Sequence, residues 1–103
     1  MQQERFRPDA DGPLRGVRVL DLSQVLVGNV LTAVLADLGA DVIKIEPPKG
    51  DPLRLWMDGG QPLHWKLYAR NKRSLALDLK QPRPREVLSR LIGTAHILVE
   101  NFR

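Results

Sequence analysis

The stretch "VRVLDLSQVLVGNVLTAVLADLGADVIKIE" (residues 17–46) decides the fold of this 103-residue chain. Its two ends, Val17–Leu22 and Asp41–Glu46, are short runs rich in β-branched residues, which is typical of buried strands. Between them, apolar residues recur at helical spacing. They are Val30, Leu31, Val34, Leu35 and Leu38. We expect Asn29 to cap the start of this helix and Gly39 to follow its end. Strand, helix and strand over this length are the size of a βαβ unit.

The C-terminal third repeats the same order of elements. "SLALDL" (Ser74–Leu79) and "HILVEN" (His96–Asn101) are predicted strands, and "KQPRPR" leads into the helix between them. That helix has an apolar stripe and is followed by Gly93. The stripe consists of Val87, Leu88, Leu91 and Ile92. Two consecutive βαβ units predict an α/β fold in which a parallel sheet has right-handed crossovers and helices over its faces.

Residues 47–73, which join the two units, are too long and too rich in Pro and Gly for a plain connection. We expect the aromatic side chains of Trp56, Trp65 and Tyr68 to pack back on the domain or on a partner, in preference to stacking on nucleic-acid bases. The run "ARNKRS" (69–74) is either a nucleic-acid patch or, more commonly for such runs, a solvated loop before a strand.

Composition excludes several classes of protein. The chain has no cysteine, so neither a disulfide framework nor a thiolate metal site is available. His64 and His96 are far apart and lack matching carboxylates, so a metal site has no support. No apolar run approaches the ~20 residues that cross a bilayer. We expect residues 1–12 to be a polar leader, residues 13–103 to be one domain, and the location to be cytoplasmic. The formal net charge of +4 suits an anionic partner.

The carboxyl ends of the predicted strands indicate where a ligand would bind. Open parallel sheets bind ligands outside these ends. Four segments therefore stand out. They are Leu22–Gly28, Glu46–Lys49, Leu79–Gln81 and Asn101–Arg103. The first leads into a helix N-terminus, whose free N–H groups favour an anion. Together the four segments could hold phosphates, a flat ring and a polar group.

A dinucleotide site of the nicotinamide type is disfavoured at the first of these segments. Its turn, "LSQVLVGNVL", has one glycine where that site uses three. The bulky side chains of Val25, Leu26 and Val27 occupy the place where backbone must approach a pyrophosphate. The chain also lacks a phosphate loop and a nucleophile elbow.

Three separated blocks resemble the opening of a family III CoA-transferase. They are "PLRGVRVLDLSQVLVGNVLTAVLADLGADVIKIEPPKGDPLR" (13–54), "NKRSLALDLKQP" (71–82) and "AHILVENFR" (95–103). This family includes formyl-CoA and carnitine CoA-transferases and the α-methylacyl-CoA racemases. The resemblance implies a Rossmann-like parallel sheet that forms the N-terminal part of a larger two-domain fold and holds part of coenzyme A. It also implies an interlocked homodimer for the full-length protein, with acyl-CoA as substrate and no metal.

The resemblance also implies which residues bind coenzyme A, and they fall at or beside the strand ends chosen above. The loop after the first strand contributes three of them, the end of the third strand four, and the end of the chain three. They are Val25, Leu26, Val27, Leu77, Asp78, Leu79, Lys80, Asn101, Phe102 and Arg103. Lys80 and Arg103 would contact phosphates, and the segment Leu26–Val27 would contact the adenosine or pantetheine portion.

The resemblance implies no catalytic residue within this chain. In the transferases an aspartate accepts the acyl group as a mixed anhydride, and CoA thiolate then gives an enzyme-bound thioester. That aspartate, and the histidine and aspartate of the racemases, lie beyond the matched region. The matched region has its own acidic residues, which we interpret as caps, turns and solvated charges. They are Asp21, Asp37, Asp41 and Asp78.

Three functions remain open from the sequence. The first is the CoA-binding N-terminal fragment of a transferase that moves CoA between an acyl-CoA and a carboxylic acid, and that is inactive alone. The second is the corresponding fragment of an α-methylacyl-CoA racemase, although "ENF" (100–102) fits the transferases better. The third is a non-enzymatic α/β module that binds nucleic acid or protein through its basic loop. Nucleic acid is the least expected partner.

Overall fold

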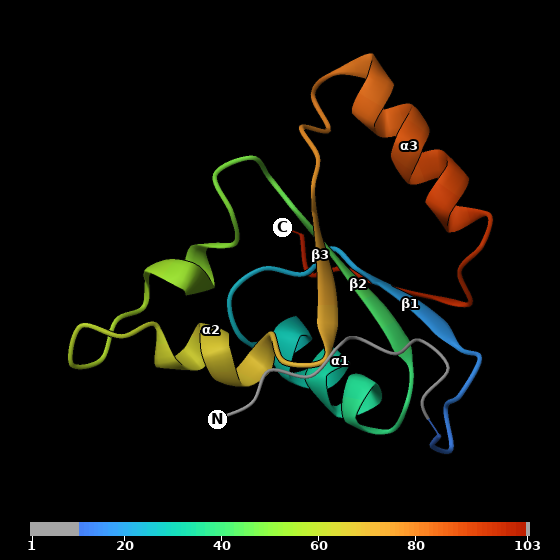
Figure 1. The fold of residues 1–103 in the computed structure, drawn as a ribbon. Coiled ribbons are helices and arrows are strands. Elements are labelled where there is room, and N and C mark those ends of the chain that lie inside the picture. Colours follow the sequence, from blue (N-terminus) through green and yellow to red (C-terminus); the bar gives the residue numbers. More distant parts are fainter. Residues whose placement is uncertain (1–10, 103) are drawn as a thin grey trace.

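The computed structural model describes residues 11–102 and contains a four-stranded sheet with the strand order β3-β2-β1-β4 (Figure 1). All three strand pairs are parallel. The predicted parallel α/β fold is therefore confirmed. The elements, in chain order, are β1 (Arg18–Asp21), α1 (Val27–Asp37), β2 (Asp41–Glu46), η1 (Pro52–Leu55), α2 (Leu63–Tyr68), β3 (Lys72–Ala76), α3 (Pro82–Ile92) and β4 (Ile97–Val99).

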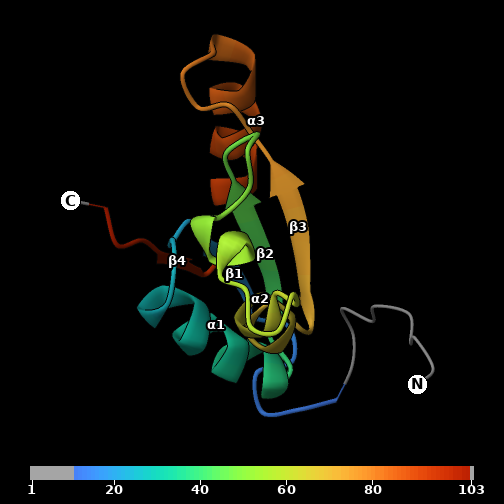
Figure 2. The same cartoon turned by 90° about the vertical axis from the view of Figure 1, so that its left-hand side faces the viewer.

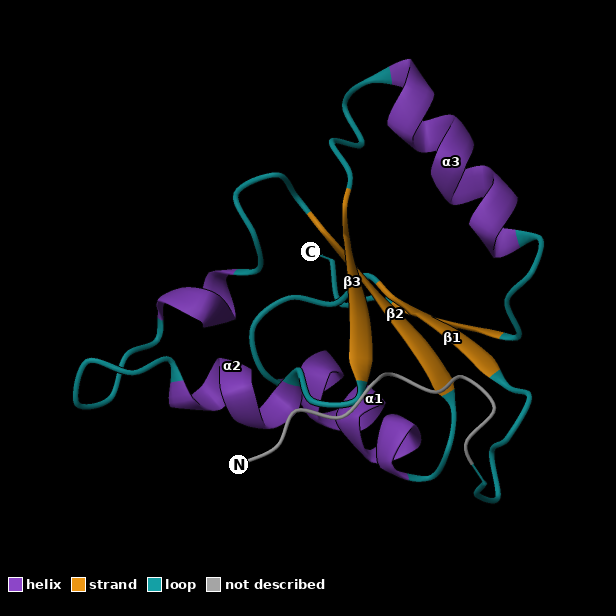
Figure 3. Ribbon diagram, in the orientation of Figure 1, coloured by secondary structure: helices purple, strands orange, loops and turns teal. Residues whose placement is uncertain are grey.

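The helices of the two units cover opposite faces of the sheet (Figure 3). Successive side chains of a strand point to opposite faces. Val19 and Val42 therefore pack toward α1 with Ala36, while Leu20 and Ile43 pack on the other face. Residues of α3 complete that second cluster as half-buried neighbours. They are Val87, Leu88 and Leu91. The chain crosses from β3 at one edge of the sheet to β4 at the other edge by way of α3. The two strands of the second unit therefore lie on either side of the two strands of the first unit.

The start of α1 differs from the prediction. The helix begins at Val27, Leu26 occupies the cap position, and no side chain caps its N-terminus. Asn29 therefore lies within the first turn, is 1% exposed, and uses its side chain elsewhere. The prediction for Gly39 is confirmed, because this residue follows the helix with a φ of +103°, a conformation in which a side chain would be strained.

The third strand begins earlier than predicted. β3 starts at Lys72 and pairs with β2 as far as Ala76, so the predicted strand 74–79 is displaced toward the N-terminus. Figure 2 shows β3 beside β2 at the edge of the sheet. Pairing begins with Lys72 opposite Val42, and the Nζ of Lys72 lies 3.2 Å from Asp21 Oδ2, a residue too distant in the sequence for the local pattern to indicate this contact. The interpretation of "ARNKRS" as a solvated loop is therefore wrong for Lys72.

The long connection contains a short helix and a 3-10 turn, and two of its aromatic residues are half-buried. The guanidinium carbon of Arg54 lies 3.9 Å from the ring centroid of Trp65, and the ring of Trp56 lies edge-on to that of His64. Trp65 and Tyr68 are half-buried, which agrees with packing back on the domain. Trp56 remains 43% exposed. Within residues 11–102 the structure has no helix with the length and apolarity that a membrane span requires.

Candidate functional site

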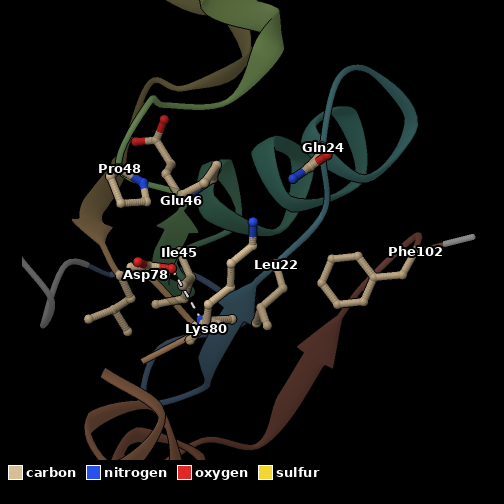
Figure 4. A pocket seen from close by; sticks show the side chains of 11 residues that line it. Leu22, Gln24, Ile45, Glu46, Pro48, Asp78, Lys80 and Phe102 are labelled. Atoms are coloured by element: carbon tan, nitrogen blue, oxygen red, sulfur yellow. Dashed lines mark hydrogen bonds between the residues drawn. The ribbon is translucent and has the colours of Figure 1, made fainter. Parts of the chain in front are cut away.

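The carboxyl ends of all four strands border one cavity of about 180 Å³ (Figure 4). The loop after β1, the turn after β2, the segment after β3 and the chain after β4 each contribute to its wall. The lining residues are Leu22, Gln24, Ile45, Glu46, Pro47, Pro48, Leu77, Asp78, Leu79, Lys80 and Phe102. Ligand pockets in proteins usually measure ~300–1,000 Å³, so a cavity of this size suits part of a large ligand.

The cavity has an apolar interior and polar groups around it. Leu22, Ile45 and Leu77 are buried core residues at its floor. The ring of Phe102, which is 59% exposed, points toward the cavity from the side of β4 (Figure 4). The ammonium group of Lys80 is exposed and has no ion-pair partner among the described residues. This combination suits an organic ligand that carries negative charge.

The cavity brings together half of the residues that the resemblance assigned to coenzyme A. These are Leu77, Asp78, Leu79, Lys80 and Phe102. The segment Val25–Val27 does not line the cavity, although its neighbour Gln24 does. Arg103 lies outside the described residues. Contact between these residues and coenzyme A stays a prediction.

Asn101 does not line the cavity, but its side chain joins the segment after β4 to the loop after β1 by hydrogen bonds. Its Oδ1 accepts a hydrogen bond from the backbone N–H of Gln24 (2.9 Å), and its Nδ2 donates to the carbonyl of Gln24 (2.8 Å). The N–H of Leu22 also donates to the carbonyl of Val99. The end of β4 is thereby joined to the β1–α1 loop. The sequence placed Asn101 at the right strand end, but it did not reveal this bond.

A second hollow shares the turn after β2 and is lined by charged groups. Glu46 is 3% exposed and receives two hydrogen bonds from Arg54, to Oε1 (2.7 Å) and to Oε2 (2.8 Å). Burial by itself favours the neutral acid. Hydrogen bonds from Arg54, Ser74 and the Asp51 N–H, with the positive charge of Arg54, outweigh burial, so the pKa of Glu46 lies below its usual value of 4.5.

This lowered pKa predicts a loss of stability in acid. The unfolded chain binds a proton at Glu46 more readily than the folded chain does, so the free energy of unfolding should decrease as the pH falls below about 4.5. The variant E46Q should be less stable than wild type at pH 7, and its stability should change less between pH 5 and about 2. Urea unfolding at a series of pH values measures both effects. An equally steep decline in E46Q would contradict the assignment.

A buried cluster of opposite charges lies beneath the β1–α1 loop. Lys44 Nζ is 2.9 Å from Asp51 Oδ2 and 3.4 Å from Asp21 Oδ1, and it also donates to the carbonyl of Ser23. Lys72 Nζ contacts the second oxygen of Asp21. All four charged side chains are at most 2% exposed. Of the roles expected for the acidic residues, Asp21 is therefore not a solvated charge, although its Oδ1 does accept a hydrogen bond from the N–H of Ser23 in a turn.

The sequence contains one indication of this cluster. Lys44 stands in the middle of "DVIKIE", a strand that is buried along its whole length. A lysine in such a strand needs an acidic partner, because an unpaired buried charge is costly. Burial also lowers the pKa of Lys72, and the neighbouring Asp21 carboxylate opposes that effect.

The other acidic residues have ordinary structural roles. Asp78 Oδ1 accepts a hydrogen bond from the N–H of Lys80 (3.1 Å), so Asp78 lies in a turn after β3, although the predicted strand 74–79 included it. Asp41 pairs with Arg18 and Arg73, and Asp37 pairs with Arg70. No group of three or more metal-ligating side chains occurs in the part of the chain that the structure describes.

The sequence of residues 14–103 matches the model of CoA-transferase family III. The chain belongs to this family. It is 45% identical over 95 residues to succinyl-CoA–D-citramalate CoA-transferase of Chloroflexus aurantiacus, covering 88% of this chain and 24% of that protein. It is 46% identical over 93 residues to formyl-CoA:oxalate CoA-transferase of Rhodopseudomonas palustris, covering 86% of this chain and 22% of that protein.

Solved structures give the same result for the fold of this family III chain. A CAIB/BAIF family protein from Brucella suis superposes with a TM-score of 0.84 at 36% identity, covering 90% of this chain and 26% of that protein. The family III chain therefore spans about a quarter of the length of the relatives that it matches.

Proposed function

We propose that this chain forms the part of a CoA-transferase that holds the coenzyme A portion of an acyl-CoA substrate. The observation that carries the proposal is the meeting of four parallel strand ends around one cavity, in a chain that belongs to CoA-transferase family III. Ligands of open parallel sheets bind at this edge. The relatives named above are transferases that act on succinyl-CoA or formyl-CoA.

The cavity has the chemical groups that part of coenzyme A requires. The exposed ammonium group of Lys80 would bind a phosphate as a point charge. Leu22, Ile45 and the ring of Phe102 would contact an apolar or flat portion of the ligand. The remaining residues that the resemblance assigns, Val25–Val27 and Asn101, would contribute from the loop and from the end of β4. Arg103 would add a second phosphate contact.

The complete protein would move CoA between an acyl-CoA and a carboxylic acid, acting as a homodimer. We place the nucleophilic aspartate in polypeptide beyond this chain. The acidic side chains near the cavity support this, because Asp21 and Asp51 are fully buried in ion pairs and Asp78 closes a turn. A nucleophile must reach its substrate with a free carboxylate. The 103-residue chain would accordingly bind CoA without catalysing transfer.

Titration of CoA into the chain, followed by isothermal calorimetry, tests the proposal. We expect saturable binding, which the variant K80A weakens about three- to tenfold because one phosphate loses a charged partner. The matched control is K66A, in which an exposed lysine is removed from α2. Absence of binding at millimolar CoA, with the chain shown to be folded by circular dichroism, would overturn the proposal. Equal affinities of wild type and K80A for CoA would show that Lys80 does not bind a phosphate of CoA.

A nucleic-acid module is disfavoured by the ion pairs of the basic run. Arg70 pairs with Asp37, Lys72 with Asp21 and Arg73 with Asp41. Cations that are paired with carboxylates have less to offer a phosphate backbone. A racemase fragment is also a weaker candidate, because the relatives named above are transferases.

A further inference from the structure

The loop between β1 and α1 contains a valine in a strained backbone conformation. Val25 has a φ of +66°. A β-branched residue rarely adopts this left-handed region, which costs of order 1–3 kcal/mol unless the surroundings enforce it. Its neighbour Gln24 lines the cavity and is held by Asn101. The conformation of Val25 therefore helps to set where one wall of the cavity lies.

Two buried side chains hold both polar groups of Val25. The N–H of Val25 donates to Asp51 Oδ1 (3.0 Å), and its carbonyl accepts from Asn29 Nδ2 (2.7 Å). Asn29 Nδ2 also donates to Asp51 Oδ2 (2.8 Å), which closes a ring of three hydrogen bonds. Asn29 and Asp51 are each 1% exposed. The bond between Asn29 and Asp51 is buried and the two bonds to Val25 are partly buried, so breaking them leaves polar groups with restricted access to water, which is costly.

The two side chains are themselves fixed by the buried lysines. Lys44 Nζ is 2.9 Å from Asp51 Oδ2, and Lys72 Nζ is 3.2 Å from Asn29 Oδ1. The N–H of Leu53 donates to Asp51 Oδ1 as well. Burial raises the pKa of Asp51, but these hydrogen bonds outweigh burial and keep the pKa below its usual value. Asp51 therefore stays an acceptor. Asp51 has partners in β2 and η1, and Asn29 has a partner in β3, so these two side chains have little freedom to move.

We propose that Asn29 and Asp51 are positioning residues, which clamp Val25 in the left-handed conformation and so hold the β1–α1 loop in the shape that binds acyl-CoA. The proposal deepens the proposed function and rests on it. Neither side chain lines the cavity, so neither is expected to touch the ligand. A clamped valine gives a stiffer loop than a glycine would, since glycine adopts this conformation freely but is more mobile in it.

The test combines N29A with V25G in this chain and measures two quantities. The first is the rate of hydrogen exchange at the amide of residue 25, compared with the amide of Leu20 in β1. The second is the dissociation constant for CoA. When residue 25 is valine, N29A should raise the rate of hydrogen exchange at the amide of residue 25. This increase should be at least about tenfold larger than any increase at the amide of Leu20. It should also weaken CoA binding by about tenfold.

The V25G background separates a clamp from general support of the fold. Glycine needs no clamp to adopt a positive φ, so N29A should weaken CoA binding by less than about threefold when residue 25 is glycine. A purely structural role for Asn29 would give the same loss in both backgrounds, and that result would overturn the proposal. So would unchanged exchange at residue 25 in N29A.

Loss of a buried amide could unfold the chain, so N29P provides a second variant. Proline is compatible with the first turn of α1 and removes the amide while filling part of its volume. In N29P, the exchange rate at the amide of Val25 should also increase much more than the rate at the amide of Leu20. If the two rates changed by the same factor relative to wild type, the clamp would be refuted. If wild type does not bind CoA, the proposed function fails, whereas the exchange rates still decide the clamp.

Discussion

Replacing Lys44 by methionine is expected to lower the free energy of unfolding by about 3–5 kcal/mol, because it leaves a buried carboxylate without its counter-charge. Lys44 lies between Asp21 and Asp51, both of which are fully buried, and also donates to the carbonyl of Ser23. Methionine keeps most of the volume but supplies neither charge nor donors. Domains of this size have a total stability of ~5–15 kcal/mol, so the loss is a large part of it.

The measurement is urea unfolding followed by circular dichroism, and K49M is the matched control. Lys49 follows the same strand but is exposed. Its replacement should change the free energy of unfolding by no more than about 0.5 kcal/mol. If K44M and K49M had the same small effect, the buried cluster would not contribute the stability that its geometry implies.

Replacing Gly28 by alanine is expected to cost about 2 kcal/mol or more, although alanine normally favours a helix. A Cβ at residue 28 would overlap Cβ and Oγ of Ser23. Ser23 cannot turn aside, because it is fully buried and both its N–H and its hydroxyl donate to Asp21. Relief of the overlap must shift the start of α1 against the loop, and overpacking of this kind typically costs ~1–3 kcal/mol.

The opposite sign is expected for G93A, which makes it a suitable control. Gly93 has a φ of −61°, which any residue adopts, and its added Cβ would meet only the carbonyl of Arg90 at 3.4 Å. Alanine there should stabilise the chain by about 0.4–1 kcal/mol through the unfolded state. Thermal or urea unfolding of both variants measures the contrast. A stabilising G28A would show that the loop and α1 move apart freely.

The parallel sheet and the location of the cavity were predictable from local patterns. Alternating strand and helix periods around 17–46, and again around 74–101, are sufficient to predict parallel strands whose carboxyl ends meet at one edge. The cavity lies at that edge, and Leu79, Lys80 and Phe102 line it as expected. The resemblance to CoA-transferase family III, which the family match confirms, added the class of ligand.

The roles of the polar residues were not predictable in the same way. Asn29 has the residue type of a helix cap, yet it bonds to Val25 and Asp51 inside the protein. Lys72 stands in a basic run that is typical of a solvated loop, yet its ammonium group lies against Asp21. Asp51 is more than twenty residues from Asn29, and Asp21 is farther still from Lys72. The contact between Asn29 and Val25 depends on a turn that local patterns do not specify.

The sequence by itself determined the order of strands and helices, the apolar faces that pack them, and the four segments that surround the cavity. These features follow from hydrophobic periodicity, which is local along the chain. Only the tertiary structure decided that Lys44, Lys72, Asp21 and Asp51 share one buried cluster, and that Asn29 and Asp51 hold Val25 in a left-handed conformation. The reason is that the free energy of a buried charge depends on which distant partner the fold brings beside it.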